Sequence, residues 1–206
     1  GEDVLNELFP GGFRHNEQSL RIVDLLENNG KGLNLTWEVR DGILNHSKTR
    51  VIDIMGEDWG KANTLEGEVC KISDAVAYIN HDIDDAIRAG IIKEDDLPAS
   101  ATSLLGHSRS ERINTMVCDI VLESWVVRGE DTSARPVIRM SDPVRTSTRE
   151  LHEFLYRRVY NNSSAQPDAE NARRTVRALY NYFNQHRDLL PPECRDPLHQ
   201  VTDYIA

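Results

Sequence analysis

The sequence predicts an all-α protein, in the form of a helical bundle followed by a C-terminal helical extension. Apolar residues recur three and four positions apart along most of its 206 residues, which is the spacing of one helix face. No stretch shows convincingly the alternation of apolar and polar residues that is typical of strands. Proline and glycine breakers separate the periodic stretches, which are therefore expected to form separate helices.

The N-terminal part is expected to contain two helices. The first follows a Pro-Gly-Gly breaker and runs from about Asn16 to Glu27. The second starts after Asn34 and ends near His46. The next segment, residues 48–61, is ambiguous, because its apolar residues fit a short strand or a packed loop equally well.

The longest helix is predicted from about Asn63 to Ala89. Asn63 is an acceptable N-cap with a glutamate three positions on, and Gly90 stops the helix. Its apolar residues are spaced alternately four and three apart: Leu65, Val69, Ile72, Val76, Ile79 and Ile83. Because this seam is unbroken, we expect the helix to be the central element and to pack on other helices along its length.

The C-terminal half is expected to continue in helices. Ser-x-x-Glu capping boxes predict helix starts at Ser108 and at Ser147. Pro167 opens a further helix, which ends before the next pair of prolines, and a short last helix follows. The simplest division of the chain is a core of residues 1–95 and a helical extension of residues 96–206 that packs on this core.

The composition excludes several classes of protein. A formal net charge of −10 argues against a general nucleic-acid binder, so binding of single-stranded nucleic acid is not indicated by charge. No stretch approaches the roughly 18 apolar residues of a membrane span, and the charged N-terminal residues do not resemble a signal peptide. The three cysteines are far apart, which favours a reducing cytoplasm, with Cys70 and Cys118 as buried apolar residues. We therefore predict a cytoplasmic protein with no membrane contact.

A polar stripe lies opposite the apolar seam of the longest helix. Its members are Asp74, Tyr78, His81, Asp82 and Asp85. A solvated helix face is the simplest explanation. However, no Lys or Arg follows until Arg88, so charge pairing along the helix does not account for three carboxylates. Tyr78 also stands four residues from an acid on each side, which favours a pocket that binds a metal and a sugar hydroxyl.

Several separated segments carry a family resemblance. They are residues 72–85 of the longest helix, residues 12–19, and residues 32–38 followed by 42–46. In order and spacing they resemble the bacterial dGTPase-like deoxynucleoside triphosphate triphosphohydrolases of the HD-domain superfamily, over about residues 1–130. Separated motifs in register make this resemblance more specific than any one of them alone.

The resemblance implies a fold, a reaction and a set of site residues. The fold is an HD-domain-like helical bundle, of which residues 1–95 would form the C-terminal part of the hydrolase core. The reaction is metal-dependent hydrolysis of a dNTP, dGTP or a similar one, to a deoxynucleoside and inorganic triphosphate. Glu2 and His15 are expected to be catalytic, with His15 contacting a phosphate oxygen. Tyr78 and Asp82 are expected to bind the deoxyribose 3′ hydroxyl, and the protein to form a homo-oligomer.

The resemblance also implies a divalent metal ion, such as Mg or Mn. In the family it is held by an early His, a His-Asp doublet and a late Asp. Asp74 matches the late Asp, whereas His81–Asp82 lies on the wrong helix to be the doublet. Gly1–Glu2 resembles the end of the family's His-x-Gly-Glu segment, so the remaining ligands and the catalytic His that Glu2 orients are expected upstream of Gly1. The chain is therefore expected to be an incomplete portion of the enzyme, with weak metal binding of its own.

Other interpretations stay open. His15 also suits the start of a helix, and His46 suits the end of one, where a cation is favoured. Arg109, Arg112 and Arg149 fit phosphate binding or an ordinary surface role. For the whole chain, the alternatives are an HD phosphohydrolase acting on another nucleotide, or a helical oligomerisation or regulatory module without activity of its own.

Overall fold

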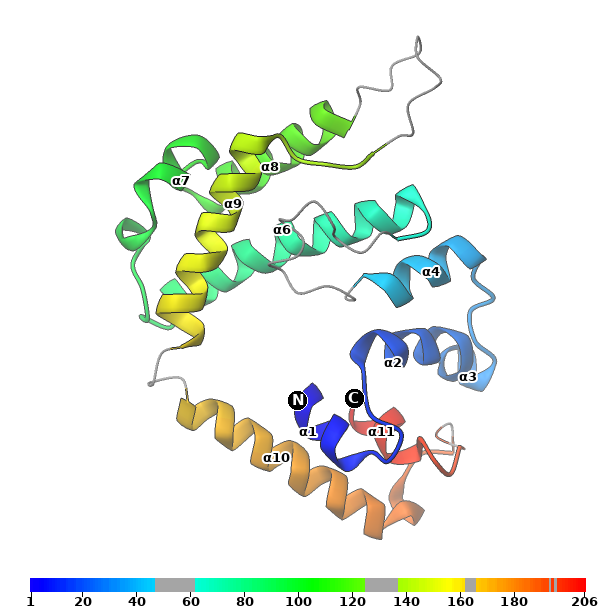
Figure 1. Cartoon of the computed structure of the whole chain (residues 1–206). Helices are drawn as coiled ribbons and strands as arrows, with labels where there is room; N and C mark the ends of the chain where they lie inside the picture. Colours follow the sequence, from blue (N-terminus) through cyan, green and yellow to red (C-terminus); the bar gives the residue numbers. More distant parts are fainter. Residues whose placement is uncertain (47–61, 125–136, 162–165, 193, 195) are drawn as a thin grey trace. The chain divides into compact units, whose positions relative to one another are not determined.

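The computed structural model describes residues 1–46, 62–124, 137–161, 166–192, 194 and 196–206 (Figure 1). Every regular element in these ranges is a helix, which confirms the predicted all-α class. The ambiguous segment 48–61 lies outside the described residues. Contacts divide the chain into two compact units, unit 1 (Gly1–Leu44 with Ser164–Ala206) and unit 2 (Asn45–Ser163). The division at residue 95 rests on sequence motifs rather than contacts, and it stays a prediction.

Unit 1 combines the two ends of the chain. Its N-terminal helices are α1 (Glu2–Leu8), α2 (His15–Arg21), the π-helical segment η1 (Ile22–Leu26), α3 (Glu27–Gly30) and α4 (Trp37–Asn45). Its C-terminal helices are α10 (Gln166–Gln185), the short 3-10 turn η5 (Arg187–Leu189) and α11 (Gln200–Ile205). Helix α10 packs against both α1 and α11. The core where they meet is made of Leu5, Phe13, Tyr180, Leu190 and Val201.

The stretch from α3 into the turn before α4 contains residues in the left-handed region. Asn28 and Asn29 have φ values of 55° and 58°, which end the first predicted helix close to where the sequence places its end. Gly32 follows at φ 73°, and a Cβ at this position would lie 2.1 Å from the carbonyl oxygen of Asp24. Only glycine fits there, and it lets the Leu33 N–H donate to the Val23 carbonyl at 2.8 Å.

Unit 2 is built around α6 (Leu65–Arg88), which at 24 residues is the longest of the described helices. It is accompanied by the 3-10 turn η2 (Glu94–Asp96), α7 (Ala99–Leu105), α8 (Arg109–Ser124), α9 (Asp142–Leu155) and the π-helical segment η3 (Tyr156–Tyr160). The core of this unit runs along α6 from Ile72 to Ile83, where α8 and α9 pack on it. The predicted central helix is therefore present, with Thr64 rather than Asn63 as its N-cap.

The apolar seam of α6 is buried over only part of its length. Ile79 and Ile83 are fully buried, whereas Leu65 is 38% exposed and Val69 45% exposed. The prediction of contact along the whole helix is wrong for these first turns, because the core of unit 2 begins at Ile72.

Two further predictions need correction. Helix α9 begins at Asp142 behind the N-cap Ser141, with a proline in its first turn, so Ser147 lies inside the helix and does not cap it. Cys70 and Cys118 are exposed rather than buried. By contrast, the capping box at Ser108 is confirmed, since its N–H donates to the Glu111 carboxylate at 3.0 Å and its hydroxyl accepts from the Glu111 N–H.

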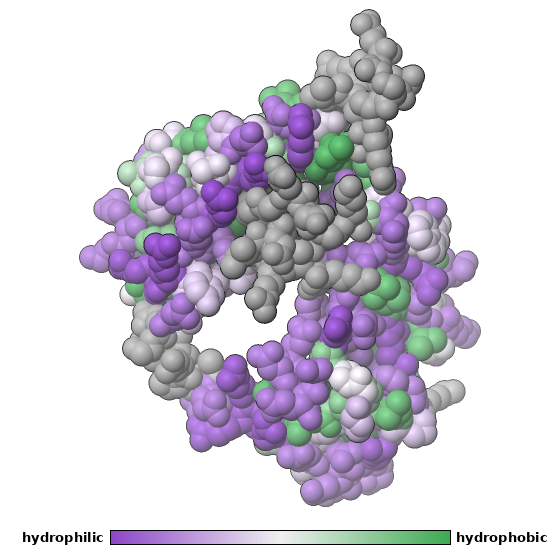
Figure 2. All heavy atoms as spheres, in the orientation of Figure 1, coloured by the Kyte–Doolittle hydropathy of each residue, from purple (hydrophilic) through white to green (hydrophobic). Residues whose placement is uncertain are grey.

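The surface on the side drawn in Figure 2 is predominantly hydrophilic, with apolar residues scattered over it. A chain with 28% charged residues is expected to look this way. None of the helices in the described part of the chain is both long enough and apolar enough to cross a bilayer.

Candidate active-site residues

In unit 1 the structure brings together the two residues that the sequence predicts to be catalytic. Helix α1 ends at a Pro-Gly-Gly turn, which is closed by the Phe13 N–H donating to Asn6 Oδ1 at 2.9 Å. The chain then reverses, and α2 begins at His15. Glu2 Oε2 lies 2.6 Å from His15 Nδ1, and Glu2 Oε1 accepts from the His15 backbone N–H at 3.2 Å. The carboxylate thus orients the imidazole and accepts from the first backbone N–H of α2.

This pair has the chemistry of an oriented imidazole. An ionised carboxylate can only accept a hydrogen bond, so His15 Nδ1 carries the proton and Nε2 of the neutral ring is the basic nitrogen. The side chains are 47% and 43% exposed, so both are within reach of a ligand. The sequence assigns Glu2 to a different His, upstream of Gly1. That assignment stays a prediction, while within this chain the partner of Glu2 is His15.

In unit 2 a second cluster forms on the polar face of α6. Tyr160, the last residue of η3, donates its hydroxyl to Asp82 Oδ2. The rings of Tyr78 and Tyr160 lie 6.4 Å apart between centroids. Burial raises the pKa of Tyr78, and the negative charge of Asp82 adds to this effect. Burial and the hydrogen bond to Asp82 raise the pKa of Tyr160 far above its ordinary value. Both phenols are therefore held protonated, as hydrogen-bond donors.

Tyr160 was not among the predicted site residues. It comes from a segment about 80 residues away in the sequence from Asp82, and only the folded chain shows their contact. The cluster of Tyr78, Asp82 and Tyr160 offers one carboxylate and two phenols on neighbouring elements. Such a set can bind a hydroxyl group, since the carboxylate accepts a hydrogen bond and a phenol can either donate or accept one.

Asp74 lies one turn before Tyr78 on α6 and is exposed. It is the candidate metal ligand, and a carboxylate suits a divalent cation. Within the described ranges, no three or more His, Cys, Asp or Glu side chains lie together in a group that could hold a metal ion. His15 belongs to unit 1 and Asp74 to unit 2, so the predicted approach of these two residues stays a prediction.

The arginines at the start of α8 fasten this helix to α6. The Arg112 guanidinium is 1% exposed and donates to Asn80 Oδ1 at 3.0 Å and to the His107 carbonyl at 2.6 Å. Arg109 contacts the ring of His81 at 3.0 Å, and both arginines pair with Asp84. Arg112 therefore fits neither phosphate binding nor an ordinary surface role, because its charge is buried inside the unit.

Arg149 and His46 remain without an assigned role. Arg149 is exposed and lies 4.0 Å from Glu153 on its own helix, an arrangement typical of a solvated helix face. His46 directly follows α4, as its helix-end interpretation requires.

Comparisons with known proteins give one family match and several relatives. Residues 138–206 match the model of a family described as a phosphohydrolase-associated domain. The chain is 48% identical, over its whole length, to a deoxyguanosinetriphosphate triphosphohydrolase-like protein of Caldanaerobacter subterraneus, of which it covers 57%. It is 42% identical to a protein of the same description from Clostridium perfringens, of which it covers 59%, and 32% identical to one from Nitrosomonas europaea, of which it covers 66%.

The helical fold and these matches define the class of the chain as an HD-superfamily protein. Within that class it belongs to the dGTPase-like family, and the predicted resemblance to a C-terminal portion of these proteins is confirmed. The chain spans less than two thirds of the length of these curated relatives.

Proposed function

We propose that the protein containing this chain hydrolyses a deoxynucleoside triphosphate, dGTP or a similar one, to a deoxynucleoside and inorganic triphosphate. The observation that carries this proposal is the cluster of Asp82, Tyr160 and Tyr78, in which a carboxylate and two phenols lie close together and offer hydrogen-bonding groups for a sugar hydroxyl. The relatives named as dGTP triphosphohydrolase-like supply the substrate class.

In this reaction a water molecule attacks the α-phosphorus and the bond to the 5′ oxygen breaks. The water oxygen leaves with the triphosphate, and the deoxynucleoside 5′ oxygen takes up a proton. His15, oriented by Glu2, contacts a phosphate oxygen or moves a proton at Nε2. The carboxylate stabilises the imidazolium form whenever the ring accepts a proton, and it prevents the ring from turning away.

Sugar recognition is assigned to unit 2. The Asp82 carboxylate and the Tyr78 hydroxyl both hydrogen-bond to the 3′ hydroxyl, and the close fit around it leaves no space for a 2′ hydroxyl. A site that pairs buried polar groups with one ligand hydroxyl discriminates strongly against ligands that do not fit it. Tyr160 holds the Asp82 carboxylate in place, so a change at Tyr160 acts on the same recognition step.

The divalent metal remains part of the proposal. Asp74 would contribute one ligand, together with ligands from outside the described residues, and the bound ion would neutralise phosphate charge. A cytoplasmic location, assembly into a homo-oligomer and the division into a core of residues 1–95 and an extension of residues 96–206 are proposals on the same footing.

Product analysis on the full-length protein tests this function. Incubation with dGTP and a divalent metal is expected to release inorganic triphosphate, and Asp74→Ala is expected to abolish the release. Asp85→Ala is the matched control, because Asp85 lies on the same stripe but is 69% exposed and paired with Arg88, so its activity should match the wild type. Release of another product would indicate an HD phosphohydrolase of different specificity. A folded, oligomeric but inactive full-length protein would indicate a regulatory module.

Tyr78→Phe tests the sugar assignment separately. Loss of one hydroxyl with retention of the ring should cost about 1 to 3 kcal/mol of transition-state binding, the cost of an unsatisfied buried partner. The measurement is kcat/KM for dGTP and for GTP. An unchanged ratio of the two would remove Tyr78 from the sugar site while leaving the rest of the proposal standing.

A further inference from the structure

The C-terminal helices of unit 1 contact both helices that supply the Glu2–His15 pair. On α2, Arg21 makes a two-pronged contact with Asp203 of α11, Nε to Oδ1 at 2.7 Å and Nη2 to Oδ2 at 2.8 Å. Gln18 donates to the same carboxylate at 3.1 Å. Gln18 and Arg21 follow His15 by three and six residues, so Asp203 contacts α2 at two points about one turn apart.

This contact is strong by its burial and geometry. The Asp203 side chain is 0% exposed and that of Arg21 only 16%. The hydrogen bond to Asp203 raises the pKa of Arg21, and Asp196 adds a second carboxylate 3.1 Å from the guanidinium. A fork-to-fork pair fixes direction as well as distance. Helix α2 cannot rotate about its axis without breaking the pair between Arg21 and Asp203. The pair therefore fixes the rotation of α2, and with it the direction in which His15 points.

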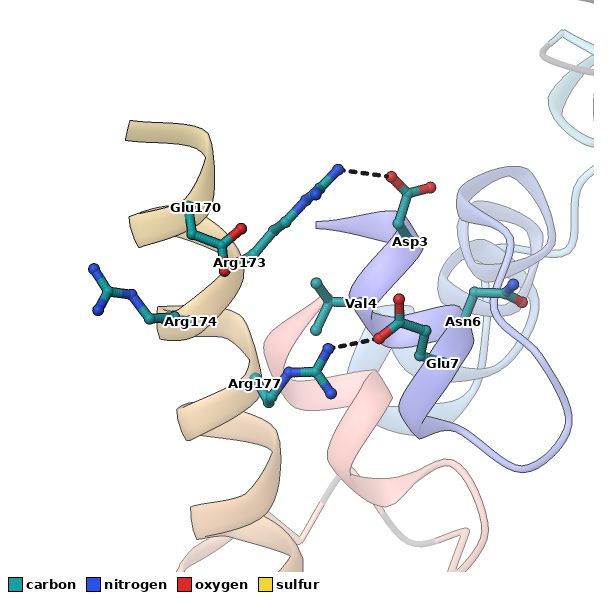
Figure 3. A pocket seen from close by; sticks show the side chains of 8 residues that line it. All are labelled: Asp3, Val4, Asn6, Glu7, Glu170, Arg173, Arg174 and Arg177. Atoms are coloured by element: carbon teal, nitrogen blue, oxygen red, sulfur yellow. Dashed lines mark hydrogen bonds and ion pairs between the residues drawn. The ribbon is translucent and has the colours of Figure 1, made fainter. Parts of the chain in front are cut away.

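Helix α1, which carries Glu2, is linked to α10 by ion pairs that are weaker than the Arg21–Asp203 pair. A cavity of about 520 Å³ lies between α1 and α10 (Figure 3). Across it Arg173 pairs with Asp3 at 3.6 Å and Arg177 with Glu7 at 2.5 Å. All four side chains are at least 46% exposed, and exposed pairs contribute little.

The lining of this cavity is balanced in formal charge. It contains three arginines and three carboxylates among its residues: Asp3, Val4, Asn6, Glu7, Glu170, Arg173, Arg174 and Arg177. Because these charges cancel, the lining is typical of packing between α1 and α10 rather than of a site that binds an anion.

We infer that Asp203 is a positioning residue that acts through Arg21 and Gln18 to hold His15 against Glu2. The inference rests on the proposed function, because it assigns Asp203 to the placement of a catalytic histidine.

Steady-state kinetics of the full-length protein test the inference. Asp203→Asn is expected to lower kcat for dGTP by on the order of tenfold to 100-fold, the cost of displacing a reacting group by about 1 Å, with little change in KM. In a His15→Gln background, the same substitution should lower kcat no further, because the group that it positions is already absent. Asp142→Asn, which removes a carboxylate from an exposed ion pair, is the control and should leave kcat unchanged.

A second measurement does not depend on activity. Long-range proton–nitrogen NMR of His15, assigned with His15→Gln, should show the Nδ1-protonated tautomer in the wild type and a mixture of tautomers in Asp203→Asn. If Asp203→Asn does not fold, Arg21→Lys replaces it, since it keeps the charge and loses the fork. Equal kcat losses from Asp203→Asn with and without His15, or an unchanged NMR spectrum, would overturn the inference. A full-length protein that releases no triphosphate would refute the proposed function, and the NMR would still decide the role of Asp203.

Discussion

Replacement of Arg112 by methionine should destabilise the protein by about 3 to 5 kcal/mol. The change keeps an apolar stem of similar length but removes a guanidinium that is only 1% exposed. Asn80 Oδ1, in a residue that is 0% exposed, and the His107 carbonyl then lose their donors. Each unsatisfied group costs about 1 to 3 kcal/mol, and breaking a buried pair by removal of one partner falls in the range of about 3 to 5 kcal/mol.

The same helix offers a matched control. Arg109 also pairs with Asp84, at 3.3 Å, but its side chain is 40% exposed. Arg109→Met should therefore cost less than about 1 kcal/mol. Urea unfolding, followed by far-ultraviolet circular dichroism as a measure of helix content, compares the stability of both variants with that of the wild type. If the two variants lose equal stability, or if Arg112→Met is neutral, burial does not govern this contact and the reasoning is refuted.

Three further predictions concern unit 2. Folding raises the pKa of Tyr160, so the stability that this residue contributes is present below its ordinary pKa of 10.0 and is lost as pH rises above it. Tyr160→Phe should flatten this loss in urea titrations at alkaline pH. Burial lowers the pKa of His152, so the stability that this residue contributes is present above its ordinary pKa of 6.5 and is lost as pH falls below it. His152→Gln should flatten that loss at acid pH. An unchanged slope of unfolding free energy against pH would show that His152 does not cause it. Ile79→Ala should cost about 2 to 5 kcal/mol by thermal or urea unfolding, whereas Val69→Ala, at an exposed position, should cost less than about 1 kcal/mol.

The fold could be predicted from the sequence where a helix carries its own signals. The seam of α6 and the capping box at Ser108 are local, so they are visible in the printed sequence. The start of α9 was missed because Ser147 has the right spacing for a capping box but is buried inside a longer helix. The exposure of Val69 was missed because apolar spacing shows which face can be buried, not how far along the helix a partner extends.

Some residues of the candidate site could likewise be predicted from the sequence, and others could not. Glu2 and His15 were selected by motif resemblance, and the structure adds that they contact one another across the turn between α1 and α2. Asp203 and Arg112 carried no such signal, since each acts through a partner more than 30 residues away in sequence. Charged residues of this kind are normally solvated, so the sequence alone favours a surface position for them.

Tyr160 was missed for a geometric reason. At about 100° per residue, a continuous α-helix would turn Tyr160 by roughly 140° from Leu155, away from the buried side of α9. The chain instead widens into η3, in which the Asn161 N–H donates to the Tyr156 carbonyl five residues back at 3.2 Å. The wider turn rotates less per residue, so Tyr160 returns toward the side of Leu155 and reaches Asp82 on α6. The third member of the proposed sugar site thus depends on a local departure from α-helical geometry, and such a departure leaves no trace in the spacing of apolar residues.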